Sequence, residues 1–453
     1  MIHKFKMGND FILLDVESGA VHIIDKIIFD ILDIFDGKND SEVLNALEKK
    51  YNPAEISEAL GELHELIDAE ELFAPEINIP QTFQNFGVVK SLCFMVAQDC
   101  NLRCKYCFGD GGSFGGERAV MSEEVGRAAV DFIIKNSGIR KHCEIDFFGG
   151  EPLLNFKTVK AVTEYVRERE KETGKIFKLT LTTNGILLDE KKISWLNENN
   201  ISLVLSLDGR KKIHDEMRPD ISGKGSYDRV IKNFKNLVES RNGENYYLRG
   251  TYTNKNLDFS ADVLSMADEG FDILSVEPVV LKNSSLALTE KDLPKIFSEY
   301  DKLTEIYLQR RKEGKGFFFF HFNVDLNNGP CVAKRLAGCG AGHEYFAVAE
   351  NGDLYPCHQF VGREKYKLGN IFSGVDENSK HWTKYFRESH VLNKPKCKNC
   401  WAKFFCSGGC HANADLFHGD IREPYEIGCE IQKKRLECAI YIQAVLQNEN
   451  PCD

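Results

Sequence analysis

The stretch that decides the fold is Cys100-Asn-Leu-Arg-Cys104-Lys-Tyr-Cys107, which places three thiols in one short loop. Thiolates are the soft ligands that iron–sulfur clusters require, and three of them leave one iron of a four-iron cluster open to a substrate or cofactor. Zinc is the main competitor, but structural zinc sites prefer four protein ligands from paired short loops. The spacing therefore favours an iron–sulfur cluster over zinc.

Strands and helices alternate along the chain that follows this loop. Apolar stretches predict six strands, at 92–97, 144–148, 178–182, 203–206, 247–251 and 273–276. Helical periodicity lies between them near 122–136, 157–172, 190–198, 226–238 and 258–268, and again near 290–312. Six such units imply a parallel sheet with right-handed crossovers, although periodicity does not decide whether the sheet closes into a barrel. Because the chemistry of parallel barrels gathers at the carboxyl ends of the strands, the cysteine loop marks the expected active site.

Further motifs stand at the ends of the later strands. Gly149-Gly150-Glu151-Pro152 ends the second strand, and its glycines allow close backbone approach while its carboxylate can pair an ammonium group. Each motif alone is a weak signal, because such stretches commonly form turns. Together, on successive strand ends of one sheet, they predict a binding site. The candidate residues are Gly149, Gly150, Glu151, Pro152, Asn184, Ser206, Asp208, Arg249 and Val276.

The cysteine usage of the whole chain indicates metal or redox chemistry. The first residues, MIHKFKMGNDFILLD, contain no uninterrupted apolar segment of a signal peptide, and no apolar run reaches the roughly 20 residues of a membrane span. We therefore expect a cytoplasmic protein without a membrane partner, in which thiols are not disulfides. The chain has 15 cysteines, of which ten fall between Cys331 and Cys452 and none falls before Cys93.

The C-terminal cysteines follow a regular spacing. Cys339-x12-Gly352-x4-Cys357 precedes Cys397-x2-Cys400-x5-Cys406-x3-Cys410, and Cys429 comes last. Outside this pattern, Cys93, Cys143, Cys438 and Cys452 are interpreted as small buried apolar residues or spare thiols. His358 and His411, which follow Cys357 and Cys410, are candidates either for a hydrogen bond that tunes a cluster or for a structural role.

The first 80 residues differ from the rest in charge, with 18 Asp and Glu against 6 Lys and Arg. This acidity makes nucleic acid an unsuitable partner for the segment. Two explanations of the acidity remain equally good: the segment binds a neutral or basic peptide, or its acidic surface keeps the protein in solution. The sequence predicts strands at 11–15 and 21–24 around a turn, and then helices after residue 27, after Ser41 and at 53–70. We expect domains at 1–78, 91–312 and 313–453, with a linker at 79–90.

The cysteine loop, with Tyr106 before its last cysteine, resembles the signature of the radical S-adenosylmethionine (SAM) superfamily. The resemblance implies that the open iron chelates SAM, whose reductive cleavage yields methionine and a 5′-deoxyadenosyl radical. It also implies that Gly149–Pro152 contacts the amino group of SAM, that the end of the fourth strand contacts the ribose, and that Arg249 pairs with the carboxylate. Val276 lies where the adenine is expected.

The C-terminal spacing resembles the seven-cysteine SPASM pattern, which binds up to two auxiliary [4Fe–4S] clusters. The resemblance assigns Cys339, Cys357 and Cys410 to the first cluster. Cys397, Cys400, Cys406 and Cys429 are assigned to the second. Cys331 either supplies the fourth ligand of the first cluster or leaves an iron open to a substrate thiolate, and the open site is our preferred interpretation.

All three regions together resemble radical SAM/SPASM maturases of ribosomally synthesised peptides, and above all the thioether-forming maturases of six-cysteine (SCIFF) precursors. The fold implied is α/β: a partial (β/α)6 radical SAM barrel between an N-terminal winged-helix-like, PqqD-like α+β domain and a C-terminal Cys-rich SPASM domain. Three [4Fe–4S] clusters and SAM are the implied cofactors. The implied partners are a Cys-rich precursor peptide, bound through its leader, and an electron donor such as flavodoxin or ferredoxin.

On this resemblance, the enzyme joins a cysteine sulfur of the peptide to a carbon atom. Other products of the same scaffold are formylglycine and carbon–carbon crosslinks. Outside enzymes, the alternatives are a multi-cluster electron carrier and a zinc-stapled peptide-binding protein.

Overall fold

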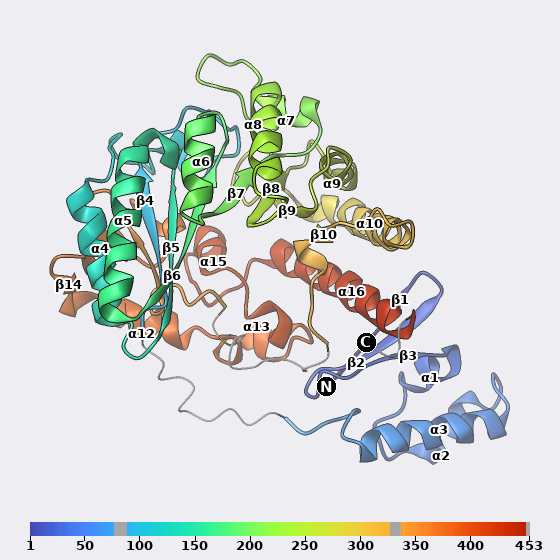
Figure 1. Ribbon diagram of the computed structural model, residues 1–453. Helices are drawn as coiled ribbons and strands as arrows, with labels where there is room; N and C mark the ends of the chain where they lie inside the picture. Colours follow the sequence, from blue (N-terminus) through green and yellow to red (C-terminus); the bar gives the residue numbers. More distant parts are fainter. Residues whose placement is uncertain (77–87, 327–335, 337, 450–453) are drawn as a thin grey trace.

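The computed structural model describes residues 1–76, 88–326, 336 and 338–449, and Figure 1 shows their arrangement. At the N-terminus, an antiparallel sheet is followed by three helices. The sheet consists of β1 (Ile2–Met7), β2 (Asp10–Asp15) and β3 (Val21–Ile24), and the helices are α1 (Lys26–Ile31), α2 (Asp40–Leu47) and α3 (Pro53–Asp68). The predicted hairpin and helices are confirmed, and β1 is an additional strand.

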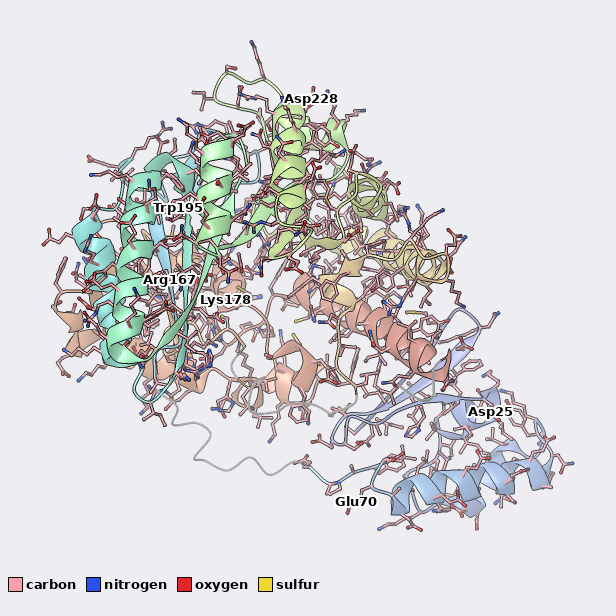
Figure 2. All side chains as sticks on the ribbon, viewed as in Figure 1. Asp25, Glu70, Arg167, Lys178, Trp195 and Asp228 are labelled. Carbon is pink, nitrogen blue, oxygen red and sulfur yellow. The ribbon has the colours of Figure 1, made fainter. Side chains whose placement is uncertain are left out.

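Local capping explains where these helices begin. The carboxylate of Asp25, labelled in Figure 2, accepts a hydrogen bond from the Ile28 N–H and so caps α1. Asn52 and Glu55 form a capping box before α3, which has a proline at its start.

The middle of the chain forms the parallel sheet that the sequence predicts. All six predicted strands are confirmed, and they pair in chain order. They are β4 (Ser91–Ala97), β5 (His142–Gly149), β6 (Ile176–Thr183), β7 (Ser202–Ser206), β8 (Tyr246–Tyr252) and β9 (Ile273–Pro278).

Helices connect these strands and cover the outer face of the sheet in Figure 1. The six predicted helices are confirmed as α4 (Glu123–Asn136), α5 (Phe156–Thr173), α6 (Glu190–Glu198), α8 (Tyr227–Glu239), α9 (Phe259–Asp268) and α10 (Leu293–Lys312). A short helix that the sequence did not predict, α7 (Lys211–Met217), follows β7.

The sheet stays open and continues into the C-terminal part of the chain. Its order is β10-β9-β8-β7-β6-β5-β4-β11-β12-β13-β14, so the barrel is partial. The added strands are β10 (Phe318–Phe319), β11 (Tyr345–Val348), β12 (Asp353–Tyr355), β13 (Gly369–Asn370) and β14 (Gly374–Val375). Because β11 pairs in parallel with β4, the segment that bears the C-terminal cysteines is fixed to the barrel at the strand that precedes the cysteine loop.

Five α-helices follow β14: α12 (Lys380–Glu388), α13 (Pro395–Lys398), α14 (Lys403–Cys406), α15 (His411–His418) and α16 (Glu426–Glu449). The long α16 packs against α10 of the barrel and also contacts β1 and β3 of the N-terminal sheet (Figure 1). It therefore joins the three parts of the chain. None of the helices in the described ranges is both long and apolar enough to cross a membrane.

Candidate active site

A cavity of about 890 Å³ lies at the carboxyl ends of the barrel strands. Cys100, Cys104 and Cys107, the N-terminal triplet, line one part of it, and Cys406, Cys410 and Cys429 line another. Gly149, Gly150, Asn184, Ser206 and Arg249 also line it. The structure thus brings the two cysteine-rich regions, which are far apart in the sequence, to one enclosed space.

Backbone contacts fold the triplet into a compact loop after β4. The Cys107 N–H donates to the Cys104 carbonyl (3.1 Å), and the Leu102 N–H points at the Cys100 sulfur at 3.4 Å. Burial, followed by Glu151 and the thiols of Cys104 and Cys107, raises the pKa of Cys100 to about 12. Because a bound metal holds thiolates, binding at this loop must displace the thiol protons.

A buried network holds the triplet loop against the ends of β7 and β8. The Tyr106 hydroxyl donates to Asp208 Oδ2 (2.6 Å), and Arg218 Nη2 donates to Asp208 Oδ1 (3.0 Å). The Thr251 N–H on β8 donates to the same Oδ1 (2.9 Å). Asp208, predicted to end the SAM-contacting fourth strand, is only 1% exposed, so in this structure its carboxylate positions Tyr106 rather than facing the cavity.

The Gly149–Pro152 motif contributes backbone to the cavity and a side chain to the sheet. Glu151 is fully buried, and its carboxylate accepts hydrogen bonds from Thr183 Oγ1 (2.9 Å), the Asn184 N–H (2.8 Å) and the Leu153 N–H (3.0 Å). Burial raises the pKa of Glu151 to about 7. Its oxygens tie the end of β6 to the motif, and neither Glu151 nor Pro152 lines the cavity, whereas both glycines do.

Arg249 is the cation that this cavity offers to a ligand. It is exposed to the cavity from β8, and its guanidinium forms no hydrogen bond with the described residues, although its backbone carbonyl accepts from the Leu207 N–H (3.2 Å). Nearby, Glu277 at the end of β9 pairs with Arg435 Nη1 (3.2 Å) and His321 Nε2 (3.3 Å). The Arg249 guanidinium is therefore accessible from the cavity, whereas Glu277 is engaged in ion pairs, and the pairing of Arg249 with a carboxylate stays a prediction. Val276 is buried in the core, and its neighbour Glu277 lines the cavity in its place.

The C-terminal thiols fall into two sets in space. Burial raises the pKa of Cys357, and the thiols of Cys410 and Cys339 raise it as well. We call Cys339, Cys357 and Cys410 the first auxiliary set. Burial raises the pKa of Cys429 to about 12, and the thiols of Cys406, Cys397 and Cys400 add to it. We call Cys397, Cys400, Cys406 and Cys429 the second auxiliary set. The sets have the same membership as the resemblance to the SPASM pattern implies, and their role as cluster ligands stays a prediction.

All thirteen cysteines in the described ranges are free thiols, and in those ranges no group of three Cys, His, Asp or Glu side chains is arranged to hold a single metal ion. A four-iron cluster spreads its thiolates over different irons, whereas zinc needs them around one ion. The three sets of thiols are therefore suited to such clusters. Cys331 and Cys452 lie outside the described residues.

The two histidines beside the cysteines have other partners. His358 Nδ1 lies 3.0 Å from the Tyr345 hydroxyl, and burial lowers its pKa to about 4. His411 Nε2 lies 3.1 Å from the Ser389 carbonyl. Both rings are thus held by structural contacts. Cys93, Cys143 and Cys438 are buried, in accord with their interpretation as small apolar residues, although Cys93 also lines the cavity.

Several side chains of the site carried no signal in the sequence. Arg218 follows α7 in a charged segment, yet its guanidinium lies 5.4 Å from the centre of the Tyr106 ring. Gln432 and Arg435 of α16 line the cavity from the C-terminal helix. Helical periodicity after Cys429 could have predicted α16, but not which of its faces meets the barrel.

A second hollow, of about 740 Å³, lies at the amino-terminal ends of β5, β6 and β7. Arg167 and Lys178, labelled in Figure 2, line it. It contains none of the three cysteine sets and lies at the end of the strands opposite to the triplet loop. We therefore assign the chemistry to the larger cavity.

Gly150 tests how closely the motif approaches the cysteine loop. A methyl group at Gly150 would lie 2.2 Å from the Asp99 carbonyl oxygen, which directly precedes Cys100. We expect Gly150→Ala to displace this backbone, to destabilise the protein by about 1–3 kcal/mol and to weaken SAM binding roughly 10- to 100-fold. Isothermal titration with SAM measures the second effect. Gly61→Ala, where a methyl group meets nothing within 4 Å, is the control and should leave SAM affinity unchanged.

His214 predicts an acid-dependent loss of stability. It is fully buried on α7, where Nδ1 accepts from the Asp208 N–H (3.3 Å) and Nε2 lies 3.0 Å from Ser226 Oγ. Burial lowers its pKa from 6.5 to about 4. The neutral ring therefore stabilises the fold fully above pH 6.5, and this contribution, on the order of 3 kcal/mol, is lost as the pH falls through about 4.

Melting temperatures across this pH range check the expectation. His214→Gln should lower the melting temperature at neutral pH but should flatten its decline toward pH 4. The exposed His142, replaced in the same way, should leave the decline as it is in the unmodified protein. Equal declines in all three proteins would contradict the role of His214.

Comparison with known families agrees with this geometry. Residues 95–252 match the model of the radical SAM superfamily, and residues 339–401 match that of the SPASM iron–sulfur cluster-binding domain. The chain therefore contains a radical SAM domain joined to a SPASM domain, and its cofactor chemistry is that of [4Fe–4S] clusters and SAM. The predicted fold class is confirmed.

Among relatives, the cysteine-type anaerobic sulfatase-maturating enzyme of Clostridium novyi (strain NT) is 27% identical over 353 residues, which cover 72% of this chain and 90% of that protein. The structure of native anSMEcpe with bound AdoMet has a TM-score of 0.65 at 22% identity, over 80% of this chain and 99% of its own. Streptococcus suis SuiB bound to S-adenosylmethionine has a TM-score of 0.52 at 17% identity, over 94% and 100%. The two structures share the fold of this chain.

Proposed function

We propose that this protein is a radical SAM/SPASM maturase that forms a sulfur-to-carbon thioether crosslink within a Cys-rich precursor peptide. The observation that carries the proposal is the single cavity that reaches from the N-terminal triplet to cysteines of both auxiliary sets. A peptide segment inside it can present a carbon atom near the triplet and a thiol near the first auxiliary set.

The residues of the triplet end of the cavity suit SAM. Cys100, Cys104 and Cys107 would hold its cluster, and the bound cofactors supply a 5′-deoxyadenosyl radical that abstracts hydrogen. Gly149 and Gly150 permit close approach of the ligand to the backbone, and Arg249 offers its carboxylate a guanidinium that hydrogen-bonds to none of the described residues. The protein orients these groups and encloses them, while the cofactors provide the radical chemistry.

The first auxiliary set suits the binding of a substrate thiolate. Within the described residues it brings three thiols together, and Cys339 and Cys410 are exposed. A cluster held by three protein thiolates keeps one iron for a further sulfur ligand. The crosslink removes a hydrogen atom from the carbon, and a proton and an electron from the thiol, so the auxiliary clusters would also supply an electron acceptor.

The N-terminal unit suits the recognition of a leader peptide. Its sheet ends in two edge strands, β1 and β3, and an extended peptide can add to such an edge through backbone hydrogen bonds. The SuiB structure, which matches 94% of this chain, supports the idea because a related structure is described as SuiB bound to precursor peptide SuiA. An external flavodoxin or ferredoxin would deliver the electrons.

Formylglycine formation is the second candidate, because the Clostridium novyi relative is a cysteine-type sulfatase-maturating enzyme. An anaerobic reaction distinguishes thioether formation from formylglycine formation. The reconstituted protein is incubated with SAM, reductant and a short Cys-rich peptide encoded beside its gene, and the peptide is then alkylated and weighed by mass spectrometry. A thioether removes two hydrogens per crosslink and one alkylatable thiol.

Three other results of this experiment would contradict the proposal that the enzyme forms a thioether. Loss of two hydrogens with every thiol retained indicates a carbon–carbon link. Exchange of a sulfur for an oxygen, with loss of two hydrogens, indicates formylglycine. An unchanged peptide, in a reaction that cleaves SAM, excludes this peptide class as the substrate.

A further inference from the structure

Lys394 is a fully buried lysine that makes no direct ion pair with a carboxylate of the described residues. It directly precedes α13 and is 0% exposed, and its Nζ donates to the Gly408 carbonyl at 2.8 Å. Among the residues that the structure describes, no Asp or Glu hydrogen-bonds to Nζ, and the carboxylate that interacts with it electrostatically, Asp420, is itself hydrogen-bonded to Tyr385 and to the Arg422 N–H. A buried ammonium group is costly unless an opposite charge compensates it. Its position therefore requires a source of negative charge nearby.

The thiols around Lys394 can supply that charge. Burial lowers the pKa of Lys394, while Cys397, Cys406, Cys410 and Cys429 act in the opposite direction. Cys410 belongs to the first auxiliary set and the other three belong to the second. As cluster ligands these residues are thiolates, so the lysine faces anionic groups of both sets.

The hydrogen bond of Lys394 lies at the point where the two sets meet. Cys406 and Cys410 are separated by Ser407, Gly408 and Gly409, whose φ values of 62°, 84° and 73° place all three in the left-handed region. This short loop thus carries one ligand of each set. Lys394 donates a hydrogen bond to the Gly408 carbonyl in the middle of this loop. The bond therefore holds both the loop and the lysine ammonium group in place.

We propose that Lys394 is a positioning residue that provides one buried positive charge to both auxiliary clusters and raises their reduction potentials. A cation stabilises the reduced cluster, which carries one more negative charge than the oxidised cluster, and the effect is strong where water is excluded. The auxiliary clusters then accept electrons more readily than they would without the lysine. The proposal rests on cluster binding by the SPASM domain, and it holds whichever product the enzyme forms.

Redox titration followed by electron paramagnetic resonance tests the proposal without peptide. Full-length protein is reconstituted anaerobically in a Cys104→Ala background, in which only the auxiliary clusters are expected to form. We expect Lys394→Met, which keeps the length of the side chain, to shift the auxiliary midpoint potentials to more negative values. Lys394→Arg keeps the charge and should leave them near those of the parent. Lys398→Met removes an exposed charge next to Cys397 and should shift them little.

Iron and sulfide analysis keeps the proposal testable if a variant does not bind the auxiliary clusters. Iron loss in Lys394→Met but not in Lys394→Arg supports the role of the charge. Unchanged potentials in Lys394→Met would overturn the proposal, as would equal shifts or equal iron loss in the Met and Arg variants. Because the titration contains no peptide, a failed crosslinking assay leaves its result intact.

Discussion

Cys104→Ala is expected to abolish the reductive cleavage of SAM and to lower the iron content by about four atoms per chain. Cys104 lies in the middle of the triplet loop and lines the same cavity as Arg249. Without its thiolate, only two ligands of the triplet remain for a cluster that needs three. The loss of activity should exceed the roughly 100-fold that changes beside a metal ligand cause. Anaerobic assays of 5′-deoxyadenosine formation, with iron and sulfide analysis, provide the measurement.

Two matched variants locate the effect. Cys143→Ala removes a buried thiol near the amino-terminal end of β5 and should keep both the iron and the SAM cleavage. Cys400→Ala alters the second auxiliary set and should lower the iron content while SAM cleavage remains measurable. SAM cleavage in Cys104→Ala at the level of Cys143→Ala would contradict the assignment of the triplet.

The parallel sheet with its connecting helices was predictable because its signals are local. Each of the six strands is a short apolar run, and each helix that follows carries its own periodicity, while α4 and α6 also begin at side-chain caps, Ser122 and Asp189. The cavity position followed from the same pattern, since the carboxyl ends of parallel strands share one edge of the sheet. The grouping of the C-terminal thiols came from the resemblance of their spacing to the SPASM pattern.

The contacts between elements far apart in the chain could not be predicted from one sequence. The parallel pairing of β11 with β4 joins segments that lie more than 200 residues apart. Nothing in Tyr345–Val348 specifies β4 as its partner, and α16 gives no indication that it contacts the N-terminal sheet. The predicted boundary at residue 313 reflects a change of composition, whereas the sheet continues across it.

Side-chain direction at the strand ends also required the structure. Glu151 and Asp208 stand where a binding carboxylate is expected, yet both are turned into buried hydrogen-bond networks. The turn after a strand decides where such a side chain points, and its geometry depends on neighbours such as Thr183 and Arg218. The same networks still serve the site, because they hold the backbone that lines the cavity.

The loss of either partner of the Glu17–Lys403 ion pair is expected to destabilise the protein by about 3–5 kcal/mol. Glu17 lies in the turn after β2 and is 4% exposed, and Lys403, at the start of α14, is 6% exposed. Lys403 Nζ lies 2.5 Å from Glu17 Oε1. Beside them, the His3 and Trp401 rings stack with centroids 3.8 Å apart. These contacts attach the N-terminal sheet to the loop between Cys400 and Cys406.

Replacing one partner leaves the other charge buried without compensation, whereas replacing both removes the two charges together. Lys403→Met and Glu17→Gln should therefore each lower the unfolding midpoint, and the double variant should recover much of the loss. Since Lys403 lies between two ligands of the second auxiliary set, the single variants should also lose iron on gel filtration. Lys380→Met, which breaks the exposed pair with Glu377, is the control and should change neither quantity.

Additive losses of stability in the double variant would show that Glu17 and Lys403 act independently. Coupled losses accompanied by iron release would instead mean that the docking of the N-terminal unit stabilises the second auxiliary set, so that the N-terminal and C-terminal parts of the chain depend on each other.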